Sequence, residues 1–171
     1  MSTSASPVSA RVVFIGAGPG EADLITVRGA RVLAQAKVVL FDALADPTLR
    51  DIAPSAEWID VGKRGFSGKP GSDFNGQTRI NDLLIEHARE VGQRFGADAT
   101  VARLKGGDPS LFGRLEEELH ALRSEGIACE VVPGVTSALA AAAATQRPLT
   151  RRGTGRSVSF TTAMTRTGDL Q

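Results

Sequence analysis

Short apolar runs rich in β-branched residues alternate with longer segments of helical periodicity, and this alternation restricts the fold more than any other feature of the chain. Runs such as RVVFIGA and KVVLFD are apolar almost throughout, as strands covered on both faces are. The predicted strands cover residues 11–17, 37–42, 57–61, 100–104 and 128–132, and the predicted helices cover 23–36, 78–95, 111–124 and an alanine-rich segment ending at 145. The pattern predicts an α/β fold with a mostly parallel sheet flanked by helices.

The first predicted helix follows a glycine-rich turn, and Glu21 or Asp23 is placed to cap it. Val27 and Leu33 are expected on its inner face. In the same way, Leu84 and Ala88 are expected on the inner face of the helix predicted over 78–95.

The order of the segments predicts one domain and the beginning of another. Residues 1–10 lack the basic start and the apolar stretch of a secretion signal and are expected to form a disordered tail. Residues 11–148 are expected to form the first α/β domain. Residues 149–171 are expected to be a linker followed by a strand over 157–162, so we expect the chain to stop within a truncated second α/β domain.

Charge and cysteine content exclude several classes of function. Lysine and arginine total 20 against 19 acidic residues, and a net charge of +1 does not favour nucleic acid or an anionic membrane. The longest apolar run, residues 138–144, is far shorter than the roughly 20 residues that cross a bilayer. The single cysteine, Cys129, has no disulfide partner and no companion for a metal site, so the sequence predicts no metal and a reducing cytoplasm.

Four unusual loops follow predicted strands. They are GAGPG at residues 16–20, the loop that opens at Asp42, Gly62-Lys63-Arg64, and Gly106-Gly107-Asp108-Pro109. In open α/β sheets, ligands bind outside the carboxyl ends of the strands. Glycine allows close approach of the backbone to a ligand, and a loop aspartate accepts hydrogen bonds. Together the loops predict a cradle for a polar cofactor.

One alternative is a Rossmann-type dinucleotide-binding domain. Asp42 ends the second predicted strand 26 residues after Gly16, close to where such a domain places its ribose-binding acid. However, the dinucleotide fingerprint requires glycine at the position of Glu21, and a carboxylate there would repel a pyrophosphate.

Five sequence blocks carry a family resemblance. GAGPG, VVLFD, DVGKR, LKGGDP with FGR, and VPGVTSA occur in the order found in the uroporphyrinogen-III C-methyltransferases of the tetrapyrrole methylase family. The chain resembles this family over about residues 11–162. The resemblance implies a two-domain homodimer that uses S-adenosylmethionine to methylate two carbons of uroporphyrinogen III. The product is precorrin-2, on the route to sirohaem and cobalamin.

The resemblance also implies roles for individual residues. Asp42 is expected to be the proton acceptor and Lys63 the proton donor. The residues expected to bind S-adenosylmethionine are Pro19, Gly106, Gly107, Asp108, Leu111, Thr136 and Ser137.

The tetrapyrrole substrate carries many carboxylates, so its site should be lined by cations. Substrate contacts are expected from Arg64, Arg114, Arg151 and Arg152. With Lys63 added, at least three of these five side chains are predicted to face one cleft.

Some positions depart from the family pattern. The loop after Lys63 is expanded and lacks the usual histidine, Leu115-Glu116-Glu117 stands where glycines are common, and Arg151 replaces a typical histidine. A further alternative therefore stays open, in which the chain is a truncated, non-catalytic module for cofactor binding or dimerisation.

Overall fold

A computed structural model describes residues 8–42, 44–62 and 73–162, with the backbone only for 73–75. Its centre is a five-stranded, fully parallel sheet in the order β3-β2-β4-β1-β5. The strands are β1 (Arg11–Gly16), β2 (Ala36–Phe41), β3 (Glu57–Asp60), β4 (Thr100–Lys105) and β5 (Cys129–Val132). The predicted α/β fold is confirmed, and each predicted strand from 11 to 132 differs from the observed one by no more than one residue at either end.

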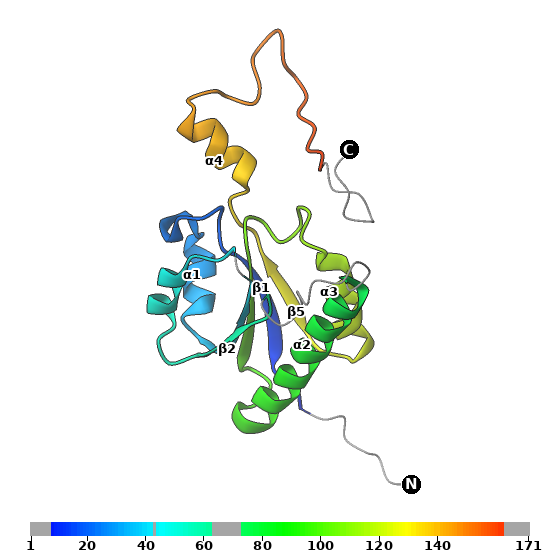
Figure 1. The fold of residues 1–171 in the computed structure, drawn as a ribbon. Helices are drawn as coiled ribbons and strands as arrows, with labels where there is room; N and C mark the ends of the chain where they lie inside the picture. The colour runs from blue at the N-terminus through cyan, green and yellow to red at the C-terminus, as the bar shows by residue number, and fades with distance from the viewer. Residues whose placement is uncertain (1–7, 43, 63–72, 163–171) are drawn as a thin grey trace.

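Helices cover both faces of the sheet (Figure 1). The helix α1 (Val27–Leu33) lies on one face, with the 3-10 helix η2 (Pro47–Ile52) in the same layer. The helices α2 (Asp73–Phe95) and α3 (Leu115–Ser124) lie on the other face. The helix α4 (Ser137–Ala144) projects beyond the end of the sheet.

Alternation along the strands produces two apolar layers. In β1, Val12 and Phe14 pack toward α2 and α3, whereas Val13 and Ile15 pack toward α1, and all four are fully buried. Successive side chains of a strand point to opposite faces, so a run that is apolar at every position fits a strand covered on both sides. The apolar composition of β1 therefore fits a strand that has a neighbour on each side and is covered by helices on both faces.

The first predicted helix is wrong in its start and in its cap. The segment divides into a 3-10 helix η1 (Ala22–Leu24) and α1, and the α1 cap is Thr26, whose Oγ1 accepts a hydrogen bond from the Gly29 backbone N–H at 3.0 Å. Glu21 makes no side-chain capping bond. Threonine adopts the extended backbone of a cap readily, and its hydroxyl satisfies an N–H that lacks a partner within the helix. Leu33 is buried as predicted, but Val27 is 68% exposed.

The other helix predictions hold in part. Leu84 and Ala88 of α2 are fully buried, as predicted. The helix predicted from residue 111 begins only at Leu115, because residues 106–114 form a loop that includes positive φ angles at Phe112 and Arg114.

The end of the described chain differs from prediction. Residues 157–162 form no strand, since no neighbouring segment pairs with them. The helix α4 has no buried residue, although its sequence, SALAAAAA, is apolar around the whole helix. Among the described residues, no helix combines the length and the apolarity needed to span a bilayer.

Candidate active site

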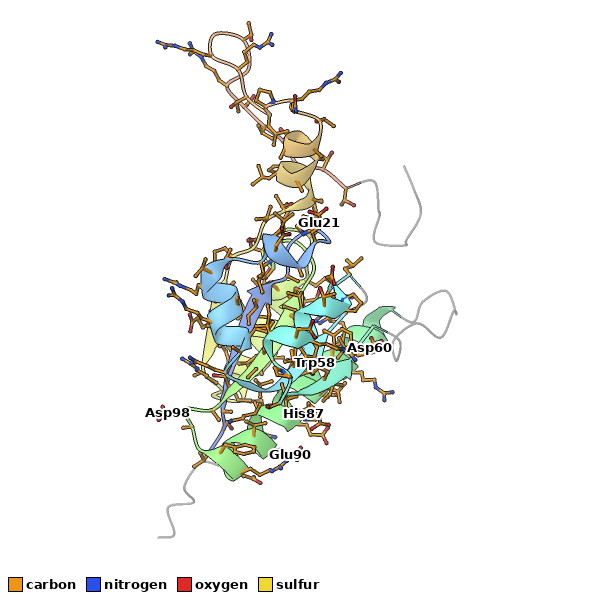
Figure 2. The ribbon with its side chains drawn as sticks, turned by 90° about the vertical axis from the view of Figure 1, so that its left-hand side faces the viewer. Glu21, Trp58, Asp60, His87, Glu90 and Asp98 are labelled. Atoms are coloured by element: carbon orange, nitrogen blue, oxygen red, sulfur yellow. The ribbon has the colours of Figure 1, made fainter. Side chains whose placement is uncertain are left out.

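The loops singled out in the sequence meet at one edge of the sheet. All strands are parallel, so the segments after β1, β2, β4 and β5 leave from the same edge. Figure 2 shows Glu21, which follows the β1 loop, at the end of the molecule from which α4 projects, and Asp98, in the turn before β4, toward the opposite end. The edge near Glu21 is therefore the carboxyl edge.

The β1 and β4 loops are bound directly to each other. The Gly107 N–H donates to the Gly18 carbonyl at 2.6 Å, and the Gly18 N–H donates to the Gly107 carbonyl at 3.3 Å. Gly107 has a φ of 65°, a conformation that glycine adopts without steric strain. The glycine corners near Pro19 and Asp108 thus form a single unit.

The β5 loop is fastened to the same unit through Asp108. One carboxylate oxygen accepts the Gly134 N–H at 2.9 Å, and the other accepts the Ser110 N–H at 2.8 Å and also bonds the Ser110 hydroxyl. Burial opposes ionisation of this carboxyl, but the hydrogen bonds from Ser110 and Gly134 outweigh it and lower the pKa of Asp108. The ionised carboxylate of Asp108 thus links the β4 loop to the β5 loop through hydrogen bonds.

Gly134 is required by close approach. A Cβ at this position would lie 2.2 Å from the Gly107 carbonyl oxygen and 2.7 Å from the Gly16 Cα. Any larger residue would separate the β5 loop from the β1 and β4 loops.

The joined loops surround a cleft of about 1090 Å³. Its wall includes loop residues from β1, β2 and β4, the beginning of α4 and residues 159–161. All seven residues predicted to bind the cofactor lie in this wall: Pro19, Gly106, Gly107, Asp108, Leu111, Thr136 and Ser137. Segments far apart in the sequence therefore converge on one space.

Asp42 also lies in the wall of the cleft, directly after β2. One carboxylate oxygen accepts the Leu44 N–H at 3.2 Å, and the other lies 3.7 Å from Nη1 of Arg103. The side chain is 27% exposed, so it stays accessible from the cleft. The Asp42 carboxylate is thus held by Leu44 and Arg103 on one side and open to the cleft on the other.

Of the three predicted substrate contacts that lie in the described part of the chain, Arg114 is the one found in the wall of the cleft. Its guanidinium makes two bonds to Glu117, at 2.8 and 2.9 Å. Arg151 and Arg152 are exposed and are not among the residues lining the cleft. Lys63 and Arg64 lie outside the described residues, so the prediction that three cations share one cleft now depends on them.

Sequence reasoning missed two cations of the cleft and the carboxylate that binds them. Arg103 and Lys105 are only 3% and 5% exposed yet line the cleft, and both contact the fully buried Glu118. A signal was present, because charged residues at positions 103 and 105 interrupt a strand whose other positions are apolar or threonine. Buried charges require partners, so they mark a site rather than a surface.

Strand order argues against the Rossmann alternative. In that fold the first two strands are neighbours, so the acid after the second lies beside the glycine turn after the first. Here β4 separates β1 from β2, and Asp42 instead faces Arg103 of β4.

The described part of the chain holds no group of three or more histidine, cysteine, aspartate or glutamate side chains with the arrangement of a metal site. The cleft instead presents backbone amides, hydroxyls, apolar side chains, a carboxylate and cations. Such a surface is suited to binding and aligning polar organic molecules.

Comparison with known proteins indicates the family to which this chain belongs. The family profile Tetrapyrrole (Corrin/Porphyrin) Methylases matches residues 11–171. A uroporphyrinogen-III C-methyltransferase of Cyanidium caldarium is 46% identical over 153 residues, which are 89% of this chain and 56% of that protein.

Solved structures agree. Uroporphyrin-III C-methyltransferase of Thermus thermophilus, in complex with S-adenyl homocysteine, is 42% identical with a TM-score of 0.64, over 84% of this chain and 51% of that one. A cobalt precorrin-4 methyltransferase is 34% identical with a TM-score of 0.73, over 94% of this chain and 61% of that one. The chain thus spans 51–61% of the length of these three proteins. The extent of these matches shows that the chain belongs to the tetrapyrrole (corrin/porphyrin) methylase family.

Proposed function

We propose that this chain acts in the S-adenosylmethionine-dependent C-methylation of uroporphyrinogen III to precorrin-2. The observation that carries the proposal is the convergence of Asp42 and all seven predicted cofactor residues on one cleft. The names of the relatives add the substrate class, since the compared relative from Cyanidium caldarium is a uroporphyrinogen-III C-methyltransferase. Because the chain spans 56% of that protein, the activity of a whole enzyme is proposed rather than shown.

The cleft fits S-adenosylmethionine in the chemistry of its wall. Thr136 and Ser137 offer hydroxyls, the glycine corner offers backbone amides and carbonyls, and Pro19 and Leu111 offer apolar contacts. This cofactor carries a methyl group on a sulfonium that is its own leaving group, so alignment and exclusion of water matter more than a metal does. A relative's complex with S-adenyl homocysteine supports the same assignment.

The tetrapyrrole would lie beside Asp42. A pyrrole ring that has accepted a methyl cation is positively charged and must lose a proton, and Asp42 would accept it on the carboxylate that faces the cleft. Arg103 would hold that carboxylate in place from the opposite side. Lys63 is proposed as the proton donor, and Arg64 and Arg114 as contacts for substrate carboxylates.

Two broader features belong to the same proposal. We expect a homodimer, from the family resemblance. We expect a reducing cytoplasmic environment because the sequence has a single cysteine. Burial raises the pKa of the Cys129 thiol, which makes it less reactive and suits a structural role.

The cofactor assignment can be tested by calorimetry with S-adenosylhomocysteine and, separately, with NAD. Binding of the first in preference to the second is expected. Preference for NAD would restore the dinucleotide alternative.

The role of Asp42 can be tested by Asp42→Asn in the protein that carries this sequence at its full natural length. Methyl transfer to uroporphyrinogen III should slow by about 10²–10⁴-fold, the usual contribution of a positioned base. Binding of S-adenosylhomocysteine should be unchanged. Asp51→Asn is the matched control, because Asp51 is exposed in η2 and is not among the cleft-lining residues. A wild-type rate for Asp42→Asn would remove Asp42 from the mechanism.

A further inference from the structure

Two buried cations lie under the cleft and share one buried carboxylate. Nε of Arg103 donates to Glu118 Oε1 at 3.1 Å, and Nζ of Lys105 donates to Glu118 Oε2 at 2.6 Å. The side chains of Arg103 and Lys105 are 4% and 6% exposed, and that of Glu118 is 0% exposed. We call these three residues the buried charge cluster.

The sheet directs the cluster toward the cleft from one face. Alternation along β4 turns Ala102 and Leu104 toward α1, so Arg103 and Lys105 point toward α3, which supplies Glu118. The loop after β4 then returns over the Lys105 stem. A Cβ at Gly113 would lie 3.1 Å from the Lys105 Cε, so glycine at this position leaves room for the lysine.

The three charges of the cluster sum to +1, and the carboxylate of Asp42 lies beside Arg103 rather than bonding Lys105. Glu118 alone is hydrogen-bonded to both cations; Asp42 lies 3.7 Å from Arg103 and is partly solvated, and the half-exposed Glu117 also interacts electrostatically with Lys105. Burial lowers the pKa of Lys105, and repulsion by Arg103 lowers it further, against the opposing attraction of Glu118 and Asp42. The ammonium of Lys105 is therefore short of negative charge on a wall that faces the cleft.

We propose that Lys105 binds a carboxylate of the tetrapyrrole substrate, with Arg103 and Glu118 holding it in position. The inference rests on the proposed function and adds to it a substrate contact that the sequence did not suggest. A bound carboxylate would place negative charge next to the Lys105 ammonium, and a charge-assisted hydrogen bond in a desolvated wall is among the stronger polar contacts.

Two ligands could supply the carboxylate that Lys105 binds, and the position of Asp42 favours the tetrapyrrole over the cofactor. The proton acceptor must touch the substrate, and Arg103 joins Asp42 to the cluster. The seven predicted cofactor contacts come from the loops after β1, β4 and β5, and Gly106 follows Lys105 directly, so the titration of S-adenosylhomocysteine is the measurement that separates the two sources. Lys105 thus takes the place in the described cleft that was predicted for Arg151 and Arg152.

Three variants test the proposal in the protein at its full natural length: Lys105→Met, Lys105→Arg and the control Lys37→Met. Lys37 is exposed in β2 and lies over the Phe95 ring, away from the cleft, so its loss removes one positive charge without touching the site. Two ligands are titrated, S-adenosylhomocysteine by calorimetry and uroporphyrin III, an unreactive oxidised analogue with the same carboxylates, by fluorescence. Methyl transfer gives KM and kcat.

Lys105→Met should weaken uroporphyrin III binding and raise KM by about 10-fold or more, the loss expected for a charge-assisted hydrogen bond. The dissociation constant for S-adenosylhomocysteine should stay unchanged. Lys105→Arg should recover most of the uroporphyrin III affinity, because it keeps the positive charge. The effect of Lys105→Met should shrink for coproporphyrin III, which has fewer carboxylates.

Other results overturn the inference. If Lys105→Met weakens S-adenosylhomocysteine instead, the carboxylate bound is that of the cofactor. If Lys105→Arg loses kcat with KM unchanged, Lys105 donates a proton and is not an anchor. Equal affinities for wild type and Lys105→Met assign the cluster to stability alone. If the wild type itself binds neither ligand, the proposed function fails before the question about Lys105 arises. Should Lys105→Met not fold, Lys105→Arg and the comparison of the two porphyrins on the wild type decide.

Discussion

Removing the charge of Glu118 should destabilise the protein strongly. In Glu118→Gln the side chain keeps its size, but one of the two oxygens that accept from Arg103 and Lys105 becomes an amide NH₂ that can only donate. Both cations then stay buried without a counter-charge in the cluster. Breaking a buried ion pair from one side costs about 3–5 kcal/mol. A loss of this size is a large part of the roughly 5–15 kcal/mol that stabilises a typical domain.

Glu117→Gln is the matched control on the next residue. Glu117 pairs with Arg114, but both side chains are nearly half exposed, so the variant should lose about 0–1 kcal/mol. Urea denaturation followed by far-UV circular dichroism gives the free energy of unfolding of each variant, and an unchanged m-value shows that the same two states are compared.

A third variant separates the cost of removing one charged partner from the net contribution of the whole cluster to the free energy of unfolding. In Arg103→Met/Lys105→Met/Glu118→Leu all three buried charges become apolar, and the stability should return to within about 1–2 kcal/mol of wild type, since apolar replacement of a whole buried ion network is often neutral. A loss below about 1 kcal/mol in Glu118→Gln would refute the reasoning, because the cations would then have to be solvated or otherwise compensated. A triple variant less stable than Glu118→Gln would show that the intact cluster makes a net contribution to the stability of the fold.

Three further outcomes follow from the loop contacts and the helix cap. Gly134→Ala should weaken S-adenosylhomocysteine binding in calorimetry and lower the melting temperature, because the added Cβ would meet the Gly107 carbonyl oxygen at 2.2 Å; unchanged values would contradict the close approach. The folded pKa of Asp108 is lowered, so its stabilisation is complete above the unfolded value near 3.8 and is lost as pH falls through the folded value. The difference in unfolding free energy between wild type and Asp108→Asn should therefore be largest at neutral pH and shrink below about pH 4, and a difference that grows in acid would reverse the sign. Thr26→Ala should lower the free energy of unfolding by about 1 kcal/mol in urea titrations, while Thr26→Ser, which keeps the hydroxyl that accepts from Gly29, should not.

Local pattern was sufficient for the strands because each is a short run rich in β-branched and other apolar residues, and in β1 the burial is nearly complete. Phe14 and Ile15 are apolar neighbours on opposite faces of β1, and only a strand covered on both sides buries both. The pattern was insufficient at α1, where periodicity alone did not show that Thr26 interrupts the helical segment. It also failed at 157–162, since alternation describes a strand that still needs a partner to pair with.

The sequence by itself determined the parallel α/β fold and, through motif resemblance, the loop residues that line the cleft. The fold class follows from the apolar runs, and the loop residues follow from short blocks such as GAGPG and LKGGDP, so each can be read from a short stretch of sequence. Only the tertiary structure decided strand order, which puts β4 between β1 and β2, and only it brought Glu118 under Arg103 and Lys105. Strand order and buried ion pairs depend on contacts between segments distant in the chain, and the hydrophobic pattern of each segment carries no information about its neighbour.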